Sequence, residues 1–366
     1  MNLSVCMIVK NEELILQKCL DSIKSVADEI IITDTGSTDK TVEIAKKYTD
    51  KIYYLKWNES FADAYEFTRK KATLPYAGRW DADFLLRGDG AEKLLELKKR
   101  NFDNADVISF TWNIAFGDNN TPINSIHRWF IYKRDKFHFE SDIHADIFPN
   151  NPSESIITKD YPSIEVDHLK DKEKKAFRYS QTLEIVKKIL KKDPLNKRIL
   201  LAYGEELLFQ RDFVQSIEVF LQFLKYEEND TEKRIYALEN LLFCYLSLHK
   251  KDDLKILLDK YYDNYASQPR FLLAYADMTV LFDIQKAEKL YLKYLLRPVN
   301  PNETIYLFDY ERHLIHPHLA LGQIYMQLNK FSEALKHLNF VIHNTRLKKR
   351  QISAMILIDK INHLKK

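Results

Sequence analysis

Two acidic clusters in the first quarter of the chain have the residue types and spacing to hold a cation and a phosphate. The first is Asp34, which opens the sequence DTGSTD, and the second is the pair Asp81 and Asp83. Carboxylates two residues apart at a strand end can turn toward one point, where their hard oxygens suit Mg²⁺ or Mn²⁺. An ion held there could bind a diphosphate in turn, although such a triplet alone is common in turns.

Asp34 is the residue of its run that local structure explains least. Gly36 permits a tight turn, and Thr38 and Asp39 are typical helix caps. An aspartate at the carboxyl edge of a parallel strand, in contrast, can accept hydrogen bonds from a base or a ribose. We therefore expect Asp34 to contact a nucleoside.

Alternating strands and helices position these carboxylates. Apolar runs predict strands over 3–9, 29–33 and 52–55, and helical periodicity predicts helices over 13–25 and 39–48. This order predicts a mostly parallel sheet whose ligand sites lie beyond the carboxyl ends of its strands. Both acidic clusters then fall at one edge of the sheet.

The second half of the chain, from about residue 172, has an almost continuous helical pattern with an internal repeat. Anchors at residues 204, 242, 275 and 322 are each followed by further small or apolar residues at constant offsets. The clearest unit contains Gly322, Tyr325 and Ala334, and it resembles a tetratricopeptide repeat (TPR). An irregular helical bundle is the alternative. The stretch 149–172, with three prolines, predicts a connection with at most one edge strand.

Composition narrows the class of protein. The 366 residues suffice for two domains, and the three cysteines (Cys6, Cys19 and Cys244) are too widely spaced for a disulfide framework or a thiolate metal site. No apolar run approaches the length of a membrane span, which is about 18 residues. We expect a soluble protein of the reducing cytoplasm.

The formal net charge is only +3 but is unevenly distributed, with an acidic excess over residues 1–170 and a basic excess over residues 171–366. A basic helical surface would suit an acidic peptide or an anionic glycan, although solvated helix faces explain the same charge. The chain has no basic motif interleaved with aromatic residues, which argues against a nucleic-acid partner.

Three separated motifs in the N-terminal half resemble the opening of family 2 glycosyltransferases of the GT-A fold. They are VCMIVKNEE at 5–13, CLDSI at 19–23 and DEIIITDTGSTD at 28–39. With the repeats, the chain is similar to the bacterial subgroup of sublancin S-glycosyltransferases. The resemblance implies an α/β GT-A nucleotide-diphospho-sugar transferase domain over residues 1–165, followed by an all-α TPR-like domain over residues 166–366.

The same resemblance assigns roles to single residues. Val9 and Glu12 would form part of the wall around the nucleotide base, and Asp34 would bind the nucleoside. Asp81 and Asp83 would hold ribose, metal and diphosphate. The segment FHFESDIHAD at 137–146 resembles a later family element whose histidine, His144, would lie near the diphosphate or the metal. His168 is a weaker match to a second family histidine, because Leu169 and Lys170 replace the usual Gly-Tyr.

The chain also departs from the family pattern. The sequence SFADAYE at 60–66 lacks the usual arginine and asparagine, and Arg69, one turn later, is the candidate substitute. Phe84 stands where an acid is usual after the Asp-x-Asp triplet, and His144 is followed by Ala145 instead of glutamate. Asp142 and Asp146 are the nearest replacements for that general base, and the sequence does not choose between them.

Together, these observations predict a hexosyltransferase with a divalent metal, Mn²⁺ or Mg²⁺, as cofactor. It would move a sugar from a nucleotide-diphosphate donor, with UDP the expected carrier, to a peptide or protein side chain, inverting the anomeric carbon. A thiol acceptor, with a pKa of about 8.5, would tolerate the missing glutamate. The TPR-like domain could bind the acceptor. A homodimer is a further possibility that the sequence does not decide. The alternatives are a surface polysaccharide or lipid-linked glycan as acceptor, or a non-catalytic adaptor with a decayed transferase domain.

Overall fold

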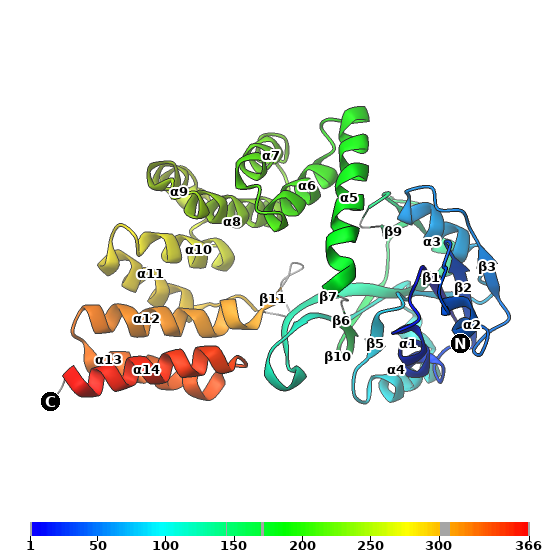
Figure 1. Ribbon diagram of the computed structural model, residues 1–366, viewed down its shortest axis with the longest axis horizontal. Coiled ribbons are helices and arrows are strands. Elements are labelled where there is room, and N and C mark those ends of the chain that lie inside the picture. Colours follow the sequence, from blue (N-terminus) through cyan, green and yellow to red (C-terminus); the bar gives the residue numbers. More distant parts are fainter. Residues whose placement is uncertain (1, 144, 170–171, 301–307, 365–366) are drawn as a thin grey trace. The chain divides into compact units, whose positions relative to one another are not determined.

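The computed structural model describes residues 2–143, 145–169, 172–300 and 308–364. The chain divides into two compact units (Figure 1), of which the first comprises residues 1–115 and 125–185 and the second residues 116–124 and 186–366. The first combines strands and helices and the second is almost wholly helical, so the expected order of an α/β domain and an all-α domain is confirmed. The boundary that we expect between residues 165 and 166 stays a prediction.

The first unit is built on a mixed β-sheet. Its strands are β1 (Leu3–Val9), β2 (Glu29–Asp34), β3 (Ile52–Tyr54), β4 (Tyr76–Arg79), β5 (Phe84–Leu86), β6 (Val107–Phe116), β7 (Pro122–Lys133) and β10 (Thr158–His168), and β8 (Phe137–Glu140) pairs separately with β9 (Asp146–Pro149). The strand order in the main sheet is β3-β2-β1-β4-β7-β6-β10-β5. The helices of this unit are α1 (Leu16–Ile23), α2 (Thr41–Ala45), α3 (Phe61–Arg69), α4 (Gly90–Lys99) and α5 (Lys172–Lys192).

The predicted alternation of the first five elements is confirmed. Strand β1 pairs in parallel with β2 and with β4. Side chains along β1 alternate between two apolar clusters, since Val5 and Met7 lie in one and Cys6 in the other. A parallel strand covered on both faces reads as a continuous apolar run, which is why Leu3–Val9 is recognisable in the sequence.

Residues 149–172 are more structured than the sequence suggests. The strand found there, β10, is not an edge strand, because it lies between β6 and β5. Its pairing with β6 shifts register between Tyr161 and Glu165, and Pro162 lies within that irregularity. Proline has no N–H to donate, so a bulge is the place where an inner strand tolerates it.

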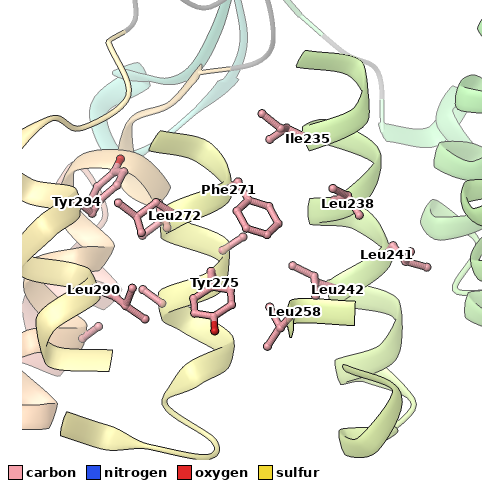
Figure 2. Close-up of a cluster of buried hydrophobic side chains, with 14 of the residues drawn as sticks. Ile235, Leu238, Leu241, Leu242, Leu258, Phe271, Leu272, Tyr275, Leu290 and Tyr294 are labelled. Atoms are coloured by element: carbon pink, nitrogen blue, oxygen red, sulfur yellow. The ribbon is translucent and has the colours of Figure 1, made fainter. Parts of the chain in front are cut away.

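The second unit consists of paired helices. They are α6 (Lys197–Phe209), α7 (Phe213–Tyr226), α8 (Thr231–Ser247), α9 (Lys251–Tyr265), α10 (Pro269–Thr279), α11 (Ile284–Leu296), α12 (His316–Gln327), α13 (Phe331–Asn344) and α14 (Lys348–Leu364), with a short strand β11 (Phe308–Asp309) and one turn of π-helix at Glu311–Ile315. Figure 2 shows side chains of α8 to α11 meeting in a continuous apolar core that includes Leu242, Phe271 and Tyr275. None of the helices described in either unit is long and apolar enough to cross a membrane.

The predicted repeat anchors at Gly204 and Gly322 agree with the helix packing. A Cβ atom added at Gly204 would lie 2.6 Å from the ring of Phe220, and one at Gly322 would lie 2.6 Å from Leu338. The hydroxyl of Ser216 donates a 2.9 Å hydrogen bond to the carbonyl of Gly204. The small residues therefore allow paired helices to approach closely.

Replacing Gly204 with alanine should destabilise the second unit. Overpacking against the buried Phe220 costs about 1–3 kcal/mol, and the helix propensity of alanine returns up to about 1 kcal/mol. Thermal unfolding followed by far-UV circular dichroism should show a lowered midpoint. The exposed change Glu218→Ala on α7 is the control, and an unchanged midpoint for Gly204→Ala would contradict the close approach.

Candidate functional site

Two loops at the carboxyl edge of the parallel strands are held together by side-chain hydrogen bonds. The N–H of Asn11 donates to Ser37 Oγ at 2.9 Å, and the side-chain Oδ1 of Asn11 accepts from the N–H of Thr38 at 2.7 Å. The N–H of Glu12 donates to Thr41 Oγ1 at 2.7 Å. The loop after β1 and the loop after β2 therefore form one continuous edge.

Val9 and Asp34 lie side by side at this edge, because they are register partners at the ends of β1 and β2. Asp34 is 4% exposed, and its carboxylate accepts the N–H groups of Gly36 and Ser37 at 3.1 and 3.0 Å. The carboxylate thus shapes the DTGSTD turn. Glu12, also buried, lies in the neighbouring loop. Nucleoside binding by these three residues stays a prediction.

Asp81 follows β4 on the other side of β1. Cys6 of β1 is the register partner of Arg79, two residues before Asp81. Strands β2 and β4 are thus separated by two strand spacings, on the order of 10 Å. The two acidic clusters that are far apart in the sequence therefore follow the two strands that flank β1, at the same edge of the sheet.

Asp81 is held by two side chains. The hydroxyl of Tyr65, on α3, donates a hydrogen bond to its carboxylate, and Arg79 Nη2 lies 3.3 Å from Asp81 Oδ2. Burial alone would raise the pKa of Asp81, but the charge of Arg79, the hydrogen bond from Tyr65 and the charge of Arg128 outweigh it, so the pKa is lowered. Asp81 is therefore ionised and paired at neutral pH.

Asp83 is held by a different partner, His168. His168 Nε2 lies 3.0 Å from Asp83 Oδ2, and the backbone carbonyl of Asp83 accepts the N–H of Leu169 at 2.9 Å. The imidazole stacks on the indole of Trp112, with ring centroids 4.9 Å apart and an interplanar angle of 21°. The end of β10 thus contacts the second carboxylate of the triplet through His168, which matches the second family histidine only weakly.

The segment that carries the candidate base lies between β8 and β9. Asp142 is exposed, and its backbone carbonyl accepts the N–H of Phe61, the first residue of α3, at 3.0 Å. Asp146 is partly buried, and its charge acts on Arg79 and Arg128. His144 lies outside the described residues.

Arg69 is not brought together with the acidic pair. Its guanidinium binds Glu66 and the carbonyl of Arg134, and the N–H of Arg134 donates to the carbonyl of Pro75. Pro75 precedes β4, whereas Asp81 follows it. Arg69 is thus at the opposite end of that strand, and its role in donor binding stays a prediction.

The cations that the fold does bring to Asp81 are Arg79 and Arg128. Arg79 is the last residue of β4, two positions before Asp81, so its place on the strand could have suggested it. Arg128 comes from the middle of β7, some 50 residues away in the sequence, and no local motif marks it. Tyr65 is likewise found only through the packing of α3.

A divalent ion can be accommodated only in part by protein groups. Within the described residues, no three His, Cys, Asp or Glu side chains form a group suited to a metal. Asp81 is already paired with Arg79, whereas Asp83 has an imidazole for its partner. One or two carboxylates completed by substrate phosphate oxygens are the usual environment of Mg²⁺ in phosphate-binding sites. The donor set therefore fits an ion that arrives with a diphosphate.

The comparison with known families agrees with this geometry. Residues 4–151 match the model of the family described as glycosyl transferase family 2. The N-terminal segment is therefore a family 2 glycosyltransferase domain, and the predicted resemblance is confirmed there.

Three curated relatives are similar to parts of the chain. The SPbeta prophage-derived glycosyltransferase SunS of Bacillus subtilis is 25% identical over 69% of this chain and 60% of its own length. A TPR repeat-containing protein of Synechococcus elongatus is 34% identical over 30% of this chain and 26% of its own length. The lipopolysaccharide core biosynthesis glycosyltransferase LpsC of Rhizobium meliloti is 35% identical over 26% of this chain and 36% of its own length. The chain thus spans less than two thirds of these relatives.

Solved structures are similar to both parts of the chain. The crystal structure of S. aureus TarS 1–349 covers 91% of this chain and 89% of that chain, with 12% identity and a TM-score of 0.32. A crystal structure of MamA covers 47% of this chain and 86% of that chain, with 17% identity and a TM-score of 0.36.

Proposed function

We propose that the chain is a glycosyltransferase that uses a nucleotide-diphosphate sugar, with UDP as the carrier. The observation that carries the proposal is that Asp34 and the Asp81/Asp83 pair follow the two strands that flank β1 in a family 2 glycosyltransferase domain. Three buried free cysteines agree with a reducing cytoplasm as its compartment.

Each candidate residue then has a task. Val9, Glu12 and Asp34 line the edge where the nucleoside would lie. Asp83, with Asp81 beside it, would hold Mn²⁺ or Mg²⁺. The ion, when bound, neutralises charge on the departing diphosphate. Asp81 accepts hydrogen bonds from Tyr65 and Arg79, and it therefore fixes the positions of both side chains at the end of β4.

We assign the general base for inverting transfer to Asp142 in preference to Asp146. Asp142 is exposed and its backbone is anchored to α3 through Phe61, so its carboxylate can reach an acceptor. Asp146 is partly buried and acts electrostatically on Arg79 and Arg128, so it is less accessible to an acceptor than Asp142.

An Asp142→Asn enzyme should therefore transfer sugar about a hundred-fold more slowly at neutral pH, because a positioned general base contributes at least that factor. The pH–rate profile should lose its acidic limb. Asp146→Asn, measured in parallel, should keep that limb. Unchanged rates for Asp142→Asn would remove the base assignment, although a thiol acceptor would reduce the effect because it ionises without help.

The acceptor proposed is a peptide or protein side chain held by the helical repeats. Stacked helical hairpins expose extended surfaces of the kind that bind peptides, and the similarity to SunS covers 69% of this chain. A glycan acceptor is the second candidate, and the similarity to LpsC favours it. A screen of cysteine-, serine- and threonine-containing peptides against an oligosaccharide panel separates the two.

Donor binding and hydrolysis test the proposal itself. A thermal-shift screen of nucleotide-sugars with and without Mn²⁺ should identify one donor that raises the melting temperature, because ligands of the native state stabilise it by mass action. The same donor should release its nucleotide diphosphate slowly without acceptor. If no donor in the panel binds or is hydrolysed, the chain is an adaptor and the proposed activity is wrong.

A further inference from the structure

Arg128 has a cationic side chain with little to bind in the described structure. It is partly buried, and its guanidinium lies 4.8 Å from the centre of the Trp112 ring. In the described part of the chain, its one hydrogen bond is a long contact of 3.4 Å from Nη2 to the carbonyl of Ala145. A guanidinium carries five N–H donors, so most of the donors of Arg128 remain available to a ligand.

Arg79 lies beside it and shares an acceptor with it. Its side chain is 12% exposed, it also donates to the carbonyl of Ala145, and it lies 4.3 Å from the ring centre of Tyr65. Its charge is balanced in part by Asp81, at 3.3 Å. Two guanidiniums therefore converge on one carbonyl, with one carboxylate in direct contact.

Unmet nitrogen atoms gather in the same region. Arg79 Nε, Trp112 Nε1 and His168 Nδ1 are buried and have no hydrogen-bond partner among the described residues. Trp112 connects Arg128 with His168. The guanidinium of Arg128 lies over the Trp112 ring, and the imidazole of His168 stacks on the same ring. Buried polar atoms are normally satisfied, so a cluster of unmet ones indicates a place for a bound ligand or water.

We infer that Arg79 and Arg128 bind the diphosphate of the donor directly, an inference that rests on the proposed function. A diphosphate carries several negative charges on outward-facing oxygens. Two guanidiniums match it in charge and in the fork geometry of bidentate hydrogen bonds.

The arrangement also explains why two like charges are kept together. Burial, and after it the charge of Arg79, lower the pKa of Arg128, although the charges of Asp146 and Asp81 act in the opposite direction. Asp81, the one carboxylate in direct contact with the pair, offsets this repulsion only in part. An anion that contacts both removes the repulsion and satisfies the donors at the same time.

Isothermal titration calorimetry with inorganic pyrophosphate and with UDP, both in EDTA, tests the inference. The wild type should bind pyrophosphate, and Arg128→Gln should bind it at least roughly tenfold more weakly, as expected for loss of a charge-assisted hydrogen bond. Arg128→Lys keeps the positive charge but cannot form the bidentate hydrogen bonds of a guanidinium, so its affinity for pyrophosphate should be intermediate. The exposed change Arg100→Gln is the matched control and should bind like the wild type.

Stability separates a binding role from a structural one. Arg128→Gln should melt no lower than the wild type without ligand, because Arg128 makes so few contacts, and pyrophosphate should stabilise the wild type more than the variant. Equal pyrophosphate affinity in the two proteins, or no binding by the wild type, would overturn the inference. The proposed function fails separately, through absence of Mn²⁺-dependent donor hydrolysis, a reaction that metal-free pyrophosphate binding does not report.

Discussion

Asp83→Asn should slow sugar transfer by about a thousand-fold, the rate equivalent of roughly 4 kcal/mol and within the several kcal/mol that a bound metal supplies to developing charge. Asparagine keeps the size of the side chain, and its amide oxygen can still face His168 Nε2. The change removes the negative charge that a divalent ion requires. Initial rates of nucleotide-diphosphate release, measured across a Mn²⁺ titration, should show that excess metal does not restore the rate.

Asp89→Asn is the control for this experiment. Asp89 lies six residues further on, is exposed, and pairs with Lys93 on α4. Its loss should leave the rate and the metal dependence unchanged. If Asp83→Asn retained wild-type activity at every Mn²⁺ concentration, the assignment of Asp83 as the metal-binding carboxylate would be wrong.

Local patterns in the sequence predict much of the fold. The strand Leu3–Val9 is buried on both faces and so reads as an uninterrupted apolar run. Gly204 and Gly322 mark helix crossings, because each leaves no space for a Cβ atom. These features depend on neighbours within one supersecondary unit, which is why spacing alone reveals them.

Features that depend on contacts between distant segments are not predictable in this way. Strand β10 contains Pro162 and polar residues, yet it lies inside the sheet between β6 and β5. Arg128 reaches the site from the middle of β7, and His168 from the end of β10. Asp34 and Asp81 follow parallel strands near the start of the chain, β2 and β4, whereas Arg128 and His168 come from β7 and β10, which no local motif links to these carboxylates.

Asp81→Asn should destabilise the first unit by about 3 kcal/mol at neutral pH, since removing one partner of a buried ion pair leaves the other charge uncompensated. Arg79 would lose its ionic partner at 3.3 Å, and Arg128 would lose a nearby balancing charge. All four tryptophans lie within residues 57–129. Urea unfolding followed by tryptophan fluorescence therefore reports on this part of the chain.

The pH dependence of this effect has a defined sign. The pKa of Asp81 is lowered in the folded protein, so its contribution to the free energy of unfolding is complete above the unfolded value, about 3.9. It is lost as the pH falls through the folded pKa. The difference between wild type and Asp81→Asn should therefore be constant near neutrality and shrink in acid.

A double variant distinguishes this ion pair from a general loss of packing around Asp81. Arg79→Met combined with Asp81→Asn removes both charges, so it should be more stable than Asp81→Asn alone, because no uncompensated guanidinium is left beside Arg128. The exposed change Asp50→Asn should leave the urea midpoint unchanged. A double variant less stable than Asp81→Asn would show that packing of the Arg79 side chain, rather than its charge balance with Asp81, stabilises this end of the sheet.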